Sequence, residues 1–509
     1  MIVEDQTEVE AFLQAWRPPG SAPAQAQIIT THISKIFLAG DRALKLKRAV
    51  RYPYVDFSDA ARRHAACVSE VRLNRRTAPT LYLGARTITR ERDGRLAFDG
   101  AGPMVDAVVE MARFDQARLA DAMAQNGELT IAMIERLARR IAEFHAGAPV
   151  SRERAGGAAM RAVLDINAAS LRQSGFLAPQ ALGALLARFD AAHARLASAL
   201  DARAERGKVR RCHGDLTLRN ICVIDGEPTP FDCLEFNDGL ATVDVLYDLA
   251  FLIMDLAHRG LKAHANVLFN RYFDEADEDD GLALVSFFAA VRAEVRGHVA
   301  AARAVETAGE ASAQAGAEAR SYLDLAGAML DAPHPRLIAV GGLSGSGKST
   351  VAAQIAPHLG PAPGARILSS DRIRKRLHGV RPDQPLPQAA YAPEVSARVY
   401  GQQRNQAADA LRAGVCVVAD AVFDRPGRRD AIAAAAREAG RPFDGFWLEA
   451  PIDALSARIE ARKGDPSDAT VAVLRAQAAK DCGPIAWRRL DATRPVADIV
   501  ADALSLTPK

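Results

Sequence analysis

Short apolar runs separated by a turn lie near the start of the chain, which predicts a sheet-rich region. In residues 36–47, the apolar run Ile-Phe-Leu is followed by a Gly40-Asp41 turn and then by Ala-Leu-Lys-Leu-Lys, the pattern of a β-hairpin. Residues 58–78 repeat with a helical period, and residues 81–98 return to a sheet-like pattern. We therefore expect a small β-rich lobe that contains one helix.

The pattern becomes helical from about Leu129 to Leu330, rich in Ala, Leu and Arg. Residues 223–232 interrupt it with a strand-like stretch that contains an Asp-Gly turn. Residues 306–320, rich in Ala, Glu and Gly, are typical either of a solvated helix or of a loose connector. These features predict a large helical lobe after the β-rich one.

The clearest domain boundary is Asp331-Ala-Pro-His-Pro335, because two prolines in three residues end a helix and favour extended backbone. We predict one domain over residues 1–330, a linker over 331–336 and a second domain over 337–509. No internal repeat relates the two halves.

Short apolar runs alternate with helical stretches after the linker. This order predicts an α/β domain with a parallel sheet covered by helices on both faces. The expected strands are residues 337–340, 367–371, 415–420 and 446–449, and residues 351–359 are expected to be helical.

Composition and charge narrow the class of protein. The chain has 509 residues, of which 49% are hydrophobic and 25% charged, so two to three globular domains are expected. A net charge of +3 gives no electrostatic footprint for nucleic acid or for an anionic membrane. The start of the chain lacks signal-peptide character, the longest apolar stretch is too short for a membrane span, and the six cysteines form no C-x-x-C pair. We expect a cytoplasmic protein with free thiols.

The most specific motif is Gly342-Leu-Ser-Gly-Ser-Gly-Lys348-Ser349, a complete G-x-x-x-x-G-K-[ST] loop between a strand and a helix. Backbone N–H groups of such a loop bind ATP phosphates, the lysine reaches the β- and γ-phosphates, and the serine hydroxyl binds Mg²⁺. The predicted nucleotide-binding residues are Gly342, Ser344, Gly345, Ser346, Gly347, Lys348, Ser349 and Thr350.

Two acids end later strands of this domain, and two arginines lie on one predicted helix. Asp371 and Asp420 end strands at the phosphate-binding edge, where a carboxylate can hold Mg²⁺ or take a hydroxyl proton, although an Asp after a strand can also be a helix cap. We predict Asp420 as a metal ligand. Arg458 and Arg462 lie one turn apart, which suits a lid over phosphates or, alternatively, a solvated basic face.

A second phosphotransfer motif lies in the first half. His213-Gly-Asp215-Leu-Thr-Leu-Arg-Asn220 has the spacing of a kinase catalytic loop, and Asp232 follows twelve residues later. In this arrangement Asp215 would orient or deprotonate the acceptor hydroxyl, while Asn220 and Asp232 would bind Mg²⁺. The alternative is a set of caps and a core histidine.

A kinase-like site also needs a phosphate-binding lysine and a glutamate on a helix that holds it. Lys45 lies on the strand after the Gly40-Asp41 turn, and Lys47 shares its face, so the sequence leaves the choice of lysine open. Glu70 is the best candidate for the helical partner. An exposed charge pattern is the competing interpretation of these residues.

The second half resembles the small P-loop kinases of the AAA-like, polynucleotide-kinase and zeta-toxin group. The resemblance rests on GLSGSGKST, SSDRIRKRL, VVADAVF and ARIEARKGDPSDAT and covers about residue 336 to the end. It implies that Asp371 activates the acceptor hydroxyl and that Arg374 binds the substrate. The lid role falls on Arg458 or Arg462.

The first half resembles the aminoglycoside phosphotransferase and choline-kinase branch of the kinase-like fold over about residues 30–300. The segments that carry it are ALKLKR, CVSEVRLNRR, VVEMARF, IAEFHA, RCHGDLTLRN and PFDCLEFNDGLATVDVLYDLAFL. The resemblance implies an α+β domain with a β-rich lobe and a large helical lobe. One departure is that no G-x-G-x-x-G precedes Lys45. The order of the halves resembles a bacterial fusion of such a domain with a P-loop domain.

The leading hypothesis is a Mg²⁺- and ATP-dependent phosphotransferase with two ATP sites that acts on hydroxyl groups of small molecules. In the second hypothesis, the first half is a pseudokinase that senses a nucleotide or metabolite and regulates a P-loop kinase. Phosphorylation of nucleic-acid ends is disfavoured by the balanced charge. The sequence identifies neither acceptor and gives no oligomeric state.

Overall fold

The computed structural model describes residues 3–18, 20, 26–52, 55–153, 156–331, 334–461 and 467–507. They divide into two compact units, the first with residues 1–154 and 204–252 and the second with 155–203 and 253–509. The predicted linker over 331–336 falls within the second unit, and its residues 332–333 lie outside the described residues. The predicted domain boundary stays a prediction.

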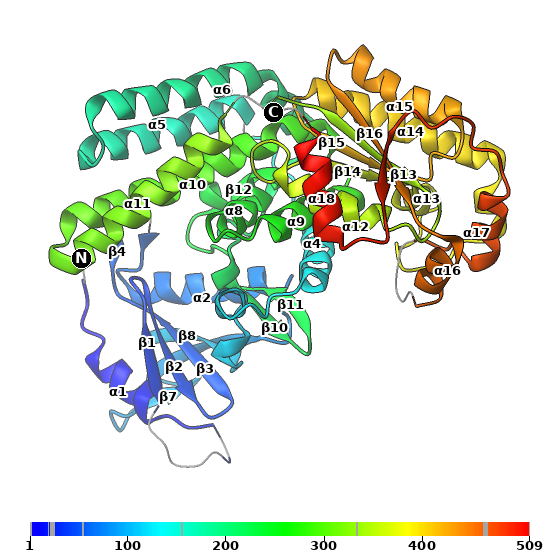
Figure 1. The fold of residues 1–509 in the computed structure, drawn as a ribbon. Helices are drawn as coiled ribbons and strands as arrows, with labels where there is room; N and C mark the ends of the chain where they lie inside the picture. Colours follow the sequence, from blue (N-terminus) through cyan, green and yellow to red (C-terminus); the bar gives the residue numbers. More distant parts are fainter. Residues whose placement is uncertain are drawn as a thin grey trace. The chain divides into compact units, whose positions relative to one another are not determined.

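A six-stranded antiparallel sheet forms the centre of the first unit (Figure 1). Its strands, in spatial order, are β1 (Gln27–Thr30), β2 (Ser34–Ala39), β3 (Arg42–Lys47), β8 (Met104–Ala112), β6 (Tyr82–Arg90) and β7 (Leu96–Phe98). The predicted hairpin over 36–47 is confirmed as β2 and β3, and Gly40 has φ 57° in their turn. A residue with a Cβ would be strained at this angle.

Successive side chains of β3 point to opposite faces of this sheet, and each face packs against a helix. Leu44 and Leu46 of β3 pack with Leu13 of α1 (Thr7–Ala15) in one core cluster. Ala43 of β3 packs on the other face with Cys67 of α2 (Ala60–Asn74), in a second cluster. Lys45 and Lys47 share this second face with Ala43, so both lysines point toward α2.

The remainder of the first unit carries the catalytic-loop motif. The helix α4 (Ile131–Ala146) is capped by Thr130, and β9 (Val209–Arg211) pairs with β12 (Thr242–Asp244) before α8 (Val245–His258). The strand predicted at 223–232 is a hairpin of β10 (Ile221–Ile224) and β11 (Glu227–Pro230). Shorter elements are β4 (Arg51–Tyr52), β5 (Val55–Asp56), α3 (Ala120–Gln125) and α7 (Asp238–Ala241).

Five long helices precede the sheet of the second unit. They are α5 (Gly156–Ser174), α6 (Pro179–Glu205), α9 (Lys262–Glu275), α10 (Val285–Glu306) and α11 (Gly309–Met329). The last residues of α6 and the first of α8 belong to the first unit. Residues 309–320 belong to α11, so the helical alternative for this Ala-rich stretch is confirmed and the loose connector is wrong.

A five-stranded parallel sheet follows, which confirms the predicted α/β arrangement (Figure 1). In spatial order its strands are β14 (Arg366–Ser369), β15 (Val417–Asp420), β13 (Leu337–Gly342), β16 (Phe443–Glu449) and β17 (Arg488–Asp491). The expectation that Asp371 ends a strand is wrong. The strand β14 ends at Ser369, and Asp371 lies in the first turn of α13 (Ser370–Leu377).

Helices cover both faces of the parallel sheet. Alternate strand residues such as Ile338 and Val418 form one core with α12 (Lys348–Ile355) and α18 (Val496–Ser505). The opposite face is covered by α14 (Pro393–Arg412) and α15 (Pro426–Glu438), each of which begins at a proline, where a missing N–H costs nothing. The helices α16 (Ile452–Glu460) and α17 (Val471–Ala478) pack together beside the phosphate loop.

The edge strand β14 is joined to α9 by a buried amide. Asn270 accepts a hydrogen bond from the Ile367 N–H at 2.7 Å and donates to the Ala365 carbonyl at 3.1 Å. Asn266 also donates to the Ala365 carbonyl, and Arg366 forms an ion pair of 2.8 Å with Asp274. The side chains of α9 thus replace the neighbouring strand that an edge strand lacks.

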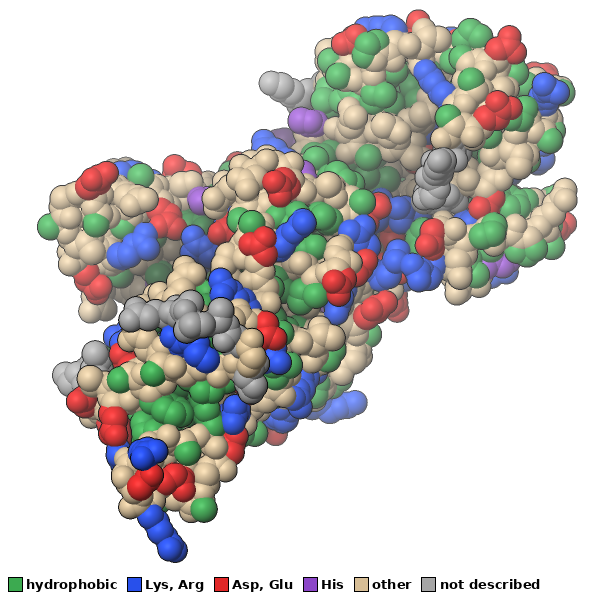
Figure 2. Space-filling view, turned by 90° about the horizontal axis from the view of Figure 1, so that it is seen from below, with side chains coloured by type: hydrophobic (Ala, Val, Ile, Leu, Met, Phe, Trp, Pro, Cys, Tyr) green, Lys and Arg blue, Asp and Glu red, His purple; other side chains and the backbone are tan. Residues whose placement is uncertain are grey.

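Acidic and basic side chains are interspersed on the face that Figure 2 shows. In the part of the chain that the structure describes, no helix is both long and apolar enough to cross a membrane.

Candidate active sites

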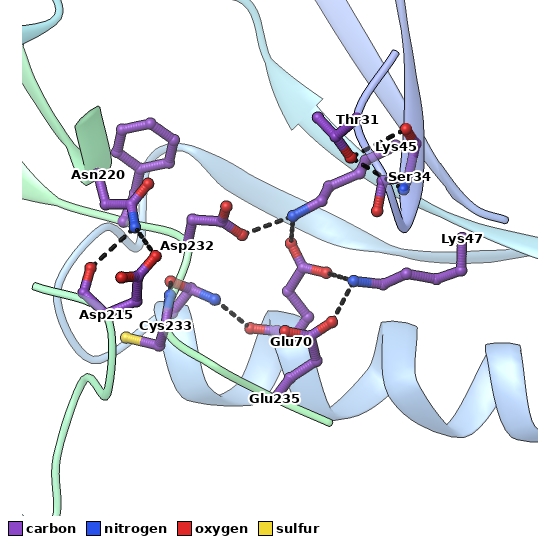
Figure 3. Close-up of polar contacts among 12 residues, drawn as sticks. Thr31, Ser34, Lys45, Lys47, Glu70, Asp215, Asn220, Asp232, Cys233 and Glu235 are labelled. Atoms are coloured by element: carbon purple, nitrogen blue, oxygen red, sulfur yellow. Dashed lines mark hydrogen bonds and ion pairs between the residues drawn. The ribbon is translucent and has the colours of Figure 1, made fainter. Parts of the chain in front are cut away.

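The candidate site of the first unit is built around Lys45 (Figure 3). Its Nζ donates to Glu70 Oε1 at 2.8 Å and to Asp232 Oδ1 at 2.5 Å. The three residues come from β3, α2 and the loop after β11, and Lys45 is 8% exposed. The structure thus brings together a lysine, a helical glutamate and the acid of the Pro-Phe-Asp segment, as phosphate and metal binding would require.

Lys47 forms a second pair of contacts beside the first. Its Nζ donates to Glu70 Oε2 and to Glu235 Oε1, and both Lys47 and Glu70 are fully buried. The two oxygens of Glu70 therefore serve two lysines. Of the two candidates that the sequence left open, only Lys45 contacts Asp232.

Burial and the neighbouring charges have opposite effects on the pKa values of Lys45 and Asp232. Burial by itself would lower the pKa of Lys45, but Asp232 and Glu70 outweigh it and raise the pKa well above its usual value. Burial would raise the pKa of Asp232, but the Lys45 charge lowers it. Lys45 is therefore a cation and Asp232 an anion at neutral pH.

Asp215 and Asn220 contact each other within the catalytic-loop motif. The Asn220 amide donates at 2.8 Å both to Asp215 Oδ2 and to the Asp215 carbonyl. The side-chain carbonyl oxygen of Asn220 and the carboxylates of Asp215 and Asp232 remain available as metal ligands. Mg²⁺ prefers oxygen ligands of this type. The chemistry of the donor set fits a magnesium ion.

The backbone of this motif is held by an acid from α8. Asp248 is fully buried and accepts the N–H groups of His213 at 3.2 Å and of Gly214 at 2.8 Å. Gly214 has φ 87°, and a Cβ there would lie 2.8 Å from the Cβ of Ala241. The loop therefore needs both the glycine and the buried acceptor to keep its shape.

The Asp232 segment is held in an unusual backbone conformation. Asp232 has φ 61°, a left-handed angle that is rare for a residue with a side chain. Its N–H donates to the Tyr82 hydroxyl at 3.1 Å, and the next N–H, of Cys233, donates to Asn74 Oδ1 at 2.8 Å. The Asn74 amide in turn donates to the Glu70 carbonyl of the same helix. Residues of β6 and α2 thus set the position of Asp232.

The connection between β1 and β2 stands where a glycine-rich loop would be. Thr31 Oγ1 donates to the Ser34 carbonyl at 3.1 Å and accepts the Ser34 N–H at 3.0 Å (Figure 3). The hydroxyl of Ser34 is buried and has no hydrogen-bond partner among the described residues. A short polar turn therefore stands at the position where the sequence lacks the G-x-G-x-x-G pattern.

The candidate site of the second unit is the phosphate loop between β13 and α12. Gly345 and Gly347 have φ 84° and 86°, and a Cβ on Gly345 would lie 2.6 Å from the Leu455 carbonyl. The Ser346 hydroxyl is buried without a hydrogen-bond partner among the described residues. Lys348 Nζ donates to the Leu343 carbonyl at 3.1 Å and so lies over the loop. An unsatisfied hydroxyl inside a left-handed glycine loop fits a bound phosphate.

Asp420 lies at the carboxyl end of β15, beside the start of α12. It accepts a hydrogen bond of 2.6 Å from the Ser349 hydroxyl and is 3% exposed. Burial raises the pKa of Asp420, although the Lys348 charge and the Ser349 hydroxyl oppose this. The hydroxyl and the carboxylate are both oxygen donors, which fits the magnesium ion that accompanies ATP.

Asp371 and Arg374 are the residues that the sequence analysis assigned to the acceptor substrate. Asp371 is on α13 and lies close enough to Asp420 to raise the pKa of that acid. Arg374 is 6% exposed, donates to the Ala390 carbonyl at 2.7 Å and lies 4.7 Å from the ring centre of Tyr391. The predicted roles of Asp371 and Arg374 stay predictions.

The predicted lid arginines are only partly described. Arg458 is on α16 and donates to the Ala492 carbonyl at 2.7 Å. Arg462 lies outside the described residues.

Two residues after α16, Asp468 and Gln477, make contacts that the sequence did not indicate. Asp468 forms an ion pair of 2.8 Å with Lys375 and accepts the Tyr391 hydroxyl at 2.7 Å. Gln477 of α17 accepts the N–H of Ser344, in the phosphate loop, at 3.0 Å. The run GDPSDAT showed a polar segment, but no spacing rule identifies partners 93 and 133 residues away.

Comparison with known proteins finds a matching family for most of the second half of the chain. Residues 337–481 match a family described as "AAA domain". Among solved structures, a gluconokinase from Sinorhizobium meliloti 1021 is 25% identical, with a TM-score of 0.24 over 34% of this chain and 91% of that one. A choline/ethanolamine kinase family protein from Mesorhizobium loti is 13% identical, with a TM-score of 0.37 over 64% of this chain and 95% of that one.

Longer matches come from mycobacteria. The chain is 31% identical over 478 residues to "Uncharacterized protein Rv2004c" of Mycobacterium tuberculosis H37Rv and to "Uncharacterized protein Mb2027c" of Mycobacterium bovis. Each alignment covers 91% of this chain and 92% of the relative. The chain belongs to the family of these mycobacterial proteins.

Proposed function

We propose that the protein is a Mg²⁺- and ATP-dependent phosphotransferase that acts on hydroxyl groups of small molecules through two separate nucleotide sites. The observation that carries the proposal is the contact of Lys45 with both Glu70 and Asp232, in a chain that also holds a complete phosphate loop. Each site has its own lysine and its own carboxylates. Neither needs a residue of the other.

In the first unit, Lys45 would bind ATP phosphates while Glu70 holds its ammonium group in place. Asn220 and Asp232 would hold the magnesium ion, whose role when bound is to neutralise the phosphate charge. Asp215 would accept the proton of the acceptor hydroxyl, or orient it. Its orientation is set by the Asn220 amide, which occupies Oδ2 and leaves Oδ1 for the acceptor.

In the second unit, the backbone of Gly342–Ser349 would bind the phosphates, and Lys348 would exchange the Leu343 carbonyl for a phosphate oxygen. Ser349 and Asp420 would hold the magnesium ion. Asp371 would take the acceptor proton, Arg374 would help to bind the substrate, and Arg458 or Arg462 would help to bind the phosphates. The buried, partly uncompensated charge of Asp420 favours a cation at this position.

The test uses the full-length protein and three variants. Consumption of ATP is measured against a panel of hydroxylated acceptors for the parent, Lys348→Ala, Asp215→Ala and the double variant. We expect each single variant to lose the turnover of a different set of acceptors and the double variant to lose all of it. The proposal fails if neither single substitution lowers any turnover.

One outcome would instead support the pseudokinase hypothesis. If all turnover disappears in Lys348→Ala and none in Asp215→Ala, the first unit is a nucleotide sensor that serves the second. Retained binding of ATP to the first unit without Mg²⁺ would support the same conclusion.

A further inference from the structure

Five charged side chains of alternating sign form an unbroken chain in the first unit. The order is Asp232, Lys45, Glu70, Lys47 and Glu235, and each neighbour contacts the next (Figure 3). A kinase-like site needs only the first three members. The last two form a second lysine–glutamate pair that the proposed mechanism does not use.

The two ends of this chain differ in exposure. The Asp232 side chain is 38% exposed, whereas that of Glu235 is 4% exposed and that of Lys47 is completely buried. A phosphate or a metal ion can therefore reach Lys45 and Asp232 but not Lys47. Lys47 is excluded as a phosphate ligand, although it lies on the same strand face.

The position of Lys47 changes what Glu70 can do to Lys45. If Glu70 had only one cationic partner, the full negative charge of its buried carboxylate would act on that one cation. Because Glu70 Oε2 contacts Lys47, only Oε1 remains for Lys45. The ammonium of Lys45 thus keeps positive charge for a second anionic partner, which is Asp232 in the absence of ligand.

The contact between Glu235 and Lys47 also holds the loop that carries Asp232 in place. It lies three residues after Asp232 in the same loop, so its contact with Lys47 ties this loop to β3. Glu235 also balances the charge of Lys47 in a site with no access to water. The loop that carries Asp232 is thereby fixed at both ends, by Tyr82 and Asn74 at one and by Lys47 at the other.

We propose that Lys47 is a positioning residue, which neutralises one oxygen of Glu70 and anchors Glu235 so that Lys45 and Asp232 are available together for Mg·ATP. This inference rests on the proposed function of the first unit. It also decides between the two lysines, with Lys45 as the phosphate ligand and Lys47 as its support.

The test measures binding of Mg·ATP by calorimetry in the full-length Lys348→Ala protein, whose phosphate-loop site is weakened. The variants are Lys47→Met, Lys45→Met, Glu235→Gln and, as a matched control, Lys35→Met on the neighbouring strand β2, where Lys35 pairs with Glu10 at the surface. The melting temperature of each variant is recorded without ligand. These are binding and stability measurements, so they do not depend on knowing the acceptor.

We expect Lys47→Met to weaken Mg·ATP binding about tenfold or more, Glu235→Gln to weaken it by a smaller factor, and Lys35→Met to leave it unchanged. Adding Glu235→Gln to Lys47→Met should recover melting temperature, because it removes an unpaired buried carboxylate, but should not recover affinity, because Glu70 is still unshared. Recovery of both would show a purely structural role and overturn the inference.

Two further outcomes are distinguishable. If Lys45→Met loses binding while Lys47→Met and Glu235→Gln bind as the parent does, the inference fails and the proposed function stands. If the parent itself binds no Mg·ATP in the first unit, the proposed function of that unit fails, and the inference fails with it. Should Lys47→Met not fold, Glu235→Gln alone decides, since unchanged affinity in that variant contradicts the anchoring of the loop.

Discussion

The hydroxyl of Ser349 donates a hydrogen bond of 2.6 Å to Asp420, 71 residues later in the chain. This contact joins the helix that follows the phosphate loop to the end of β15. It holds a carboxylate that is only 3% exposed, and this has a consequence for stability that can be measured.

Asp420→Asn should make the ligand-free protein more stable and remove its response to Mg·ATP. Burial raises the pKa of Asp420, so ionisation of this carboxyl opposes folding as the pH rises above its usual value. An amide removes that cost at neutral pH but cannot neutralise a magnesium ion. The check is the melting temperature with and without Mg·ATP, recorded in the Asp232→Asn background, which removes a magnesium ligand of the first unit, so that only the second unit responds. A Mg²⁺-dependent rise as large as the parent's would contradict this role.

Asp468→Asn should destabilise the second unit by about 3 kcal/mol, because it leaves a buried lysine without its counter-ion. The Lys375 side chain is 1% exposed, and Asp468 is its ion-pair partner. Tyr391→Phe is the matched control, since it removes only one neutral donor from the same carboxylate and should cost about 1 kcal/mol. Urea unfolding gives both values. Equal losses in the two variants would show that the charge pair is unimportant.

The pH dependence of the same pair has a definite sign. Burial would raise the pKa of Asp468, but the hydrogen bonds from Lys375 and Tyr391 lower it below its usual value. The stabilisation is therefore complete above the usual carboxyl pKa and is lost as the pH falls through the lowered one. Asp468→Asn should lack this part of the acid transition.

Glu294 of α10 should make the protein less stable as the pH rises toward neutrality. Burial raises its pKa from 4.5 to about 7, and Asn167 is its hydrogen-bond partner at 2.9 Å. The pKa is raised only in the folded state, so the contribution of Glu294 to the free energy of unfolding is greatest below about pH 4.5. It then falls by up to about 3 kcal/mol as the pH reaches about 7.

Glu294→Gln should remove that decline and be the more stable protein at about pH 8. Unfolding free energies at about pH 5 and about pH 8 test this, with Glu310→Gln, an exposed carboxyl in the first turn of α11, as the control. Parallel pH profiles for the parent and Glu294→Gln would contradict the prediction.

Asn270→Ala should open the edge of the parallel sheet. The substitution leaves the Ile367 N–H without its acceptor and removes one donor from the Ala365 carbonyl, at a cost of about 2 kcal/mol. Hydrogen exchange at the Ile367 amide should become faster, while Lys262→Ala, on the exposed side of the same helix, should leave it unchanged. Unchanged exchange in Asn270→Ala would show that the helix does not protect this edge.

Local sequence signals predicted much of the fold. The hairpin was predicted from the Gly40-Asp41 turn between two short runs in residues 36–47. The parallel strand β13 was predicted from its apolar run directly before the glycine loop. The strand β17 was missed because only Leu490 of Arg488–Asp491 is buried, so this edge strand has no apolar run. The end of β14 was misplaced because Ser369-Ser370-Asp371 suits a strand end and a helix start equally well.

In the candidate sites, residues within short motifs could be predicted from the sequence, whereas contacts between distant residues could not. Asp215 and Asn220 lie in one short motif, and Lys348 and Ser349 in another, so spacing alone identified them. The second lysine–glutamate pair could not be inferred, because Lys47 and Glu235 are 188 residues apart and only the folded sheet brings them together. Supports such as Tyr82 and Asn74 accept hydrogen bonds from backbone N–H groups. Because every residue except proline has such a group, the sequence does not indicate which N–H they bind.

The central claim is that one chain holds two independent nucleotide sites, and the stoichiometry of Mg·ATP-analogue binding tests it most directly. Calorimetry with a non-hydrolysable ATP analogue and Mg²⁺ should give two molecules per chain for the parent. It should give one for Lys348→Ala and one for Asp232→Asn, each with the affinity of the site that remains. A single molecule per chain in the parent, or the loss of all binding in either variant, would contradict the claim.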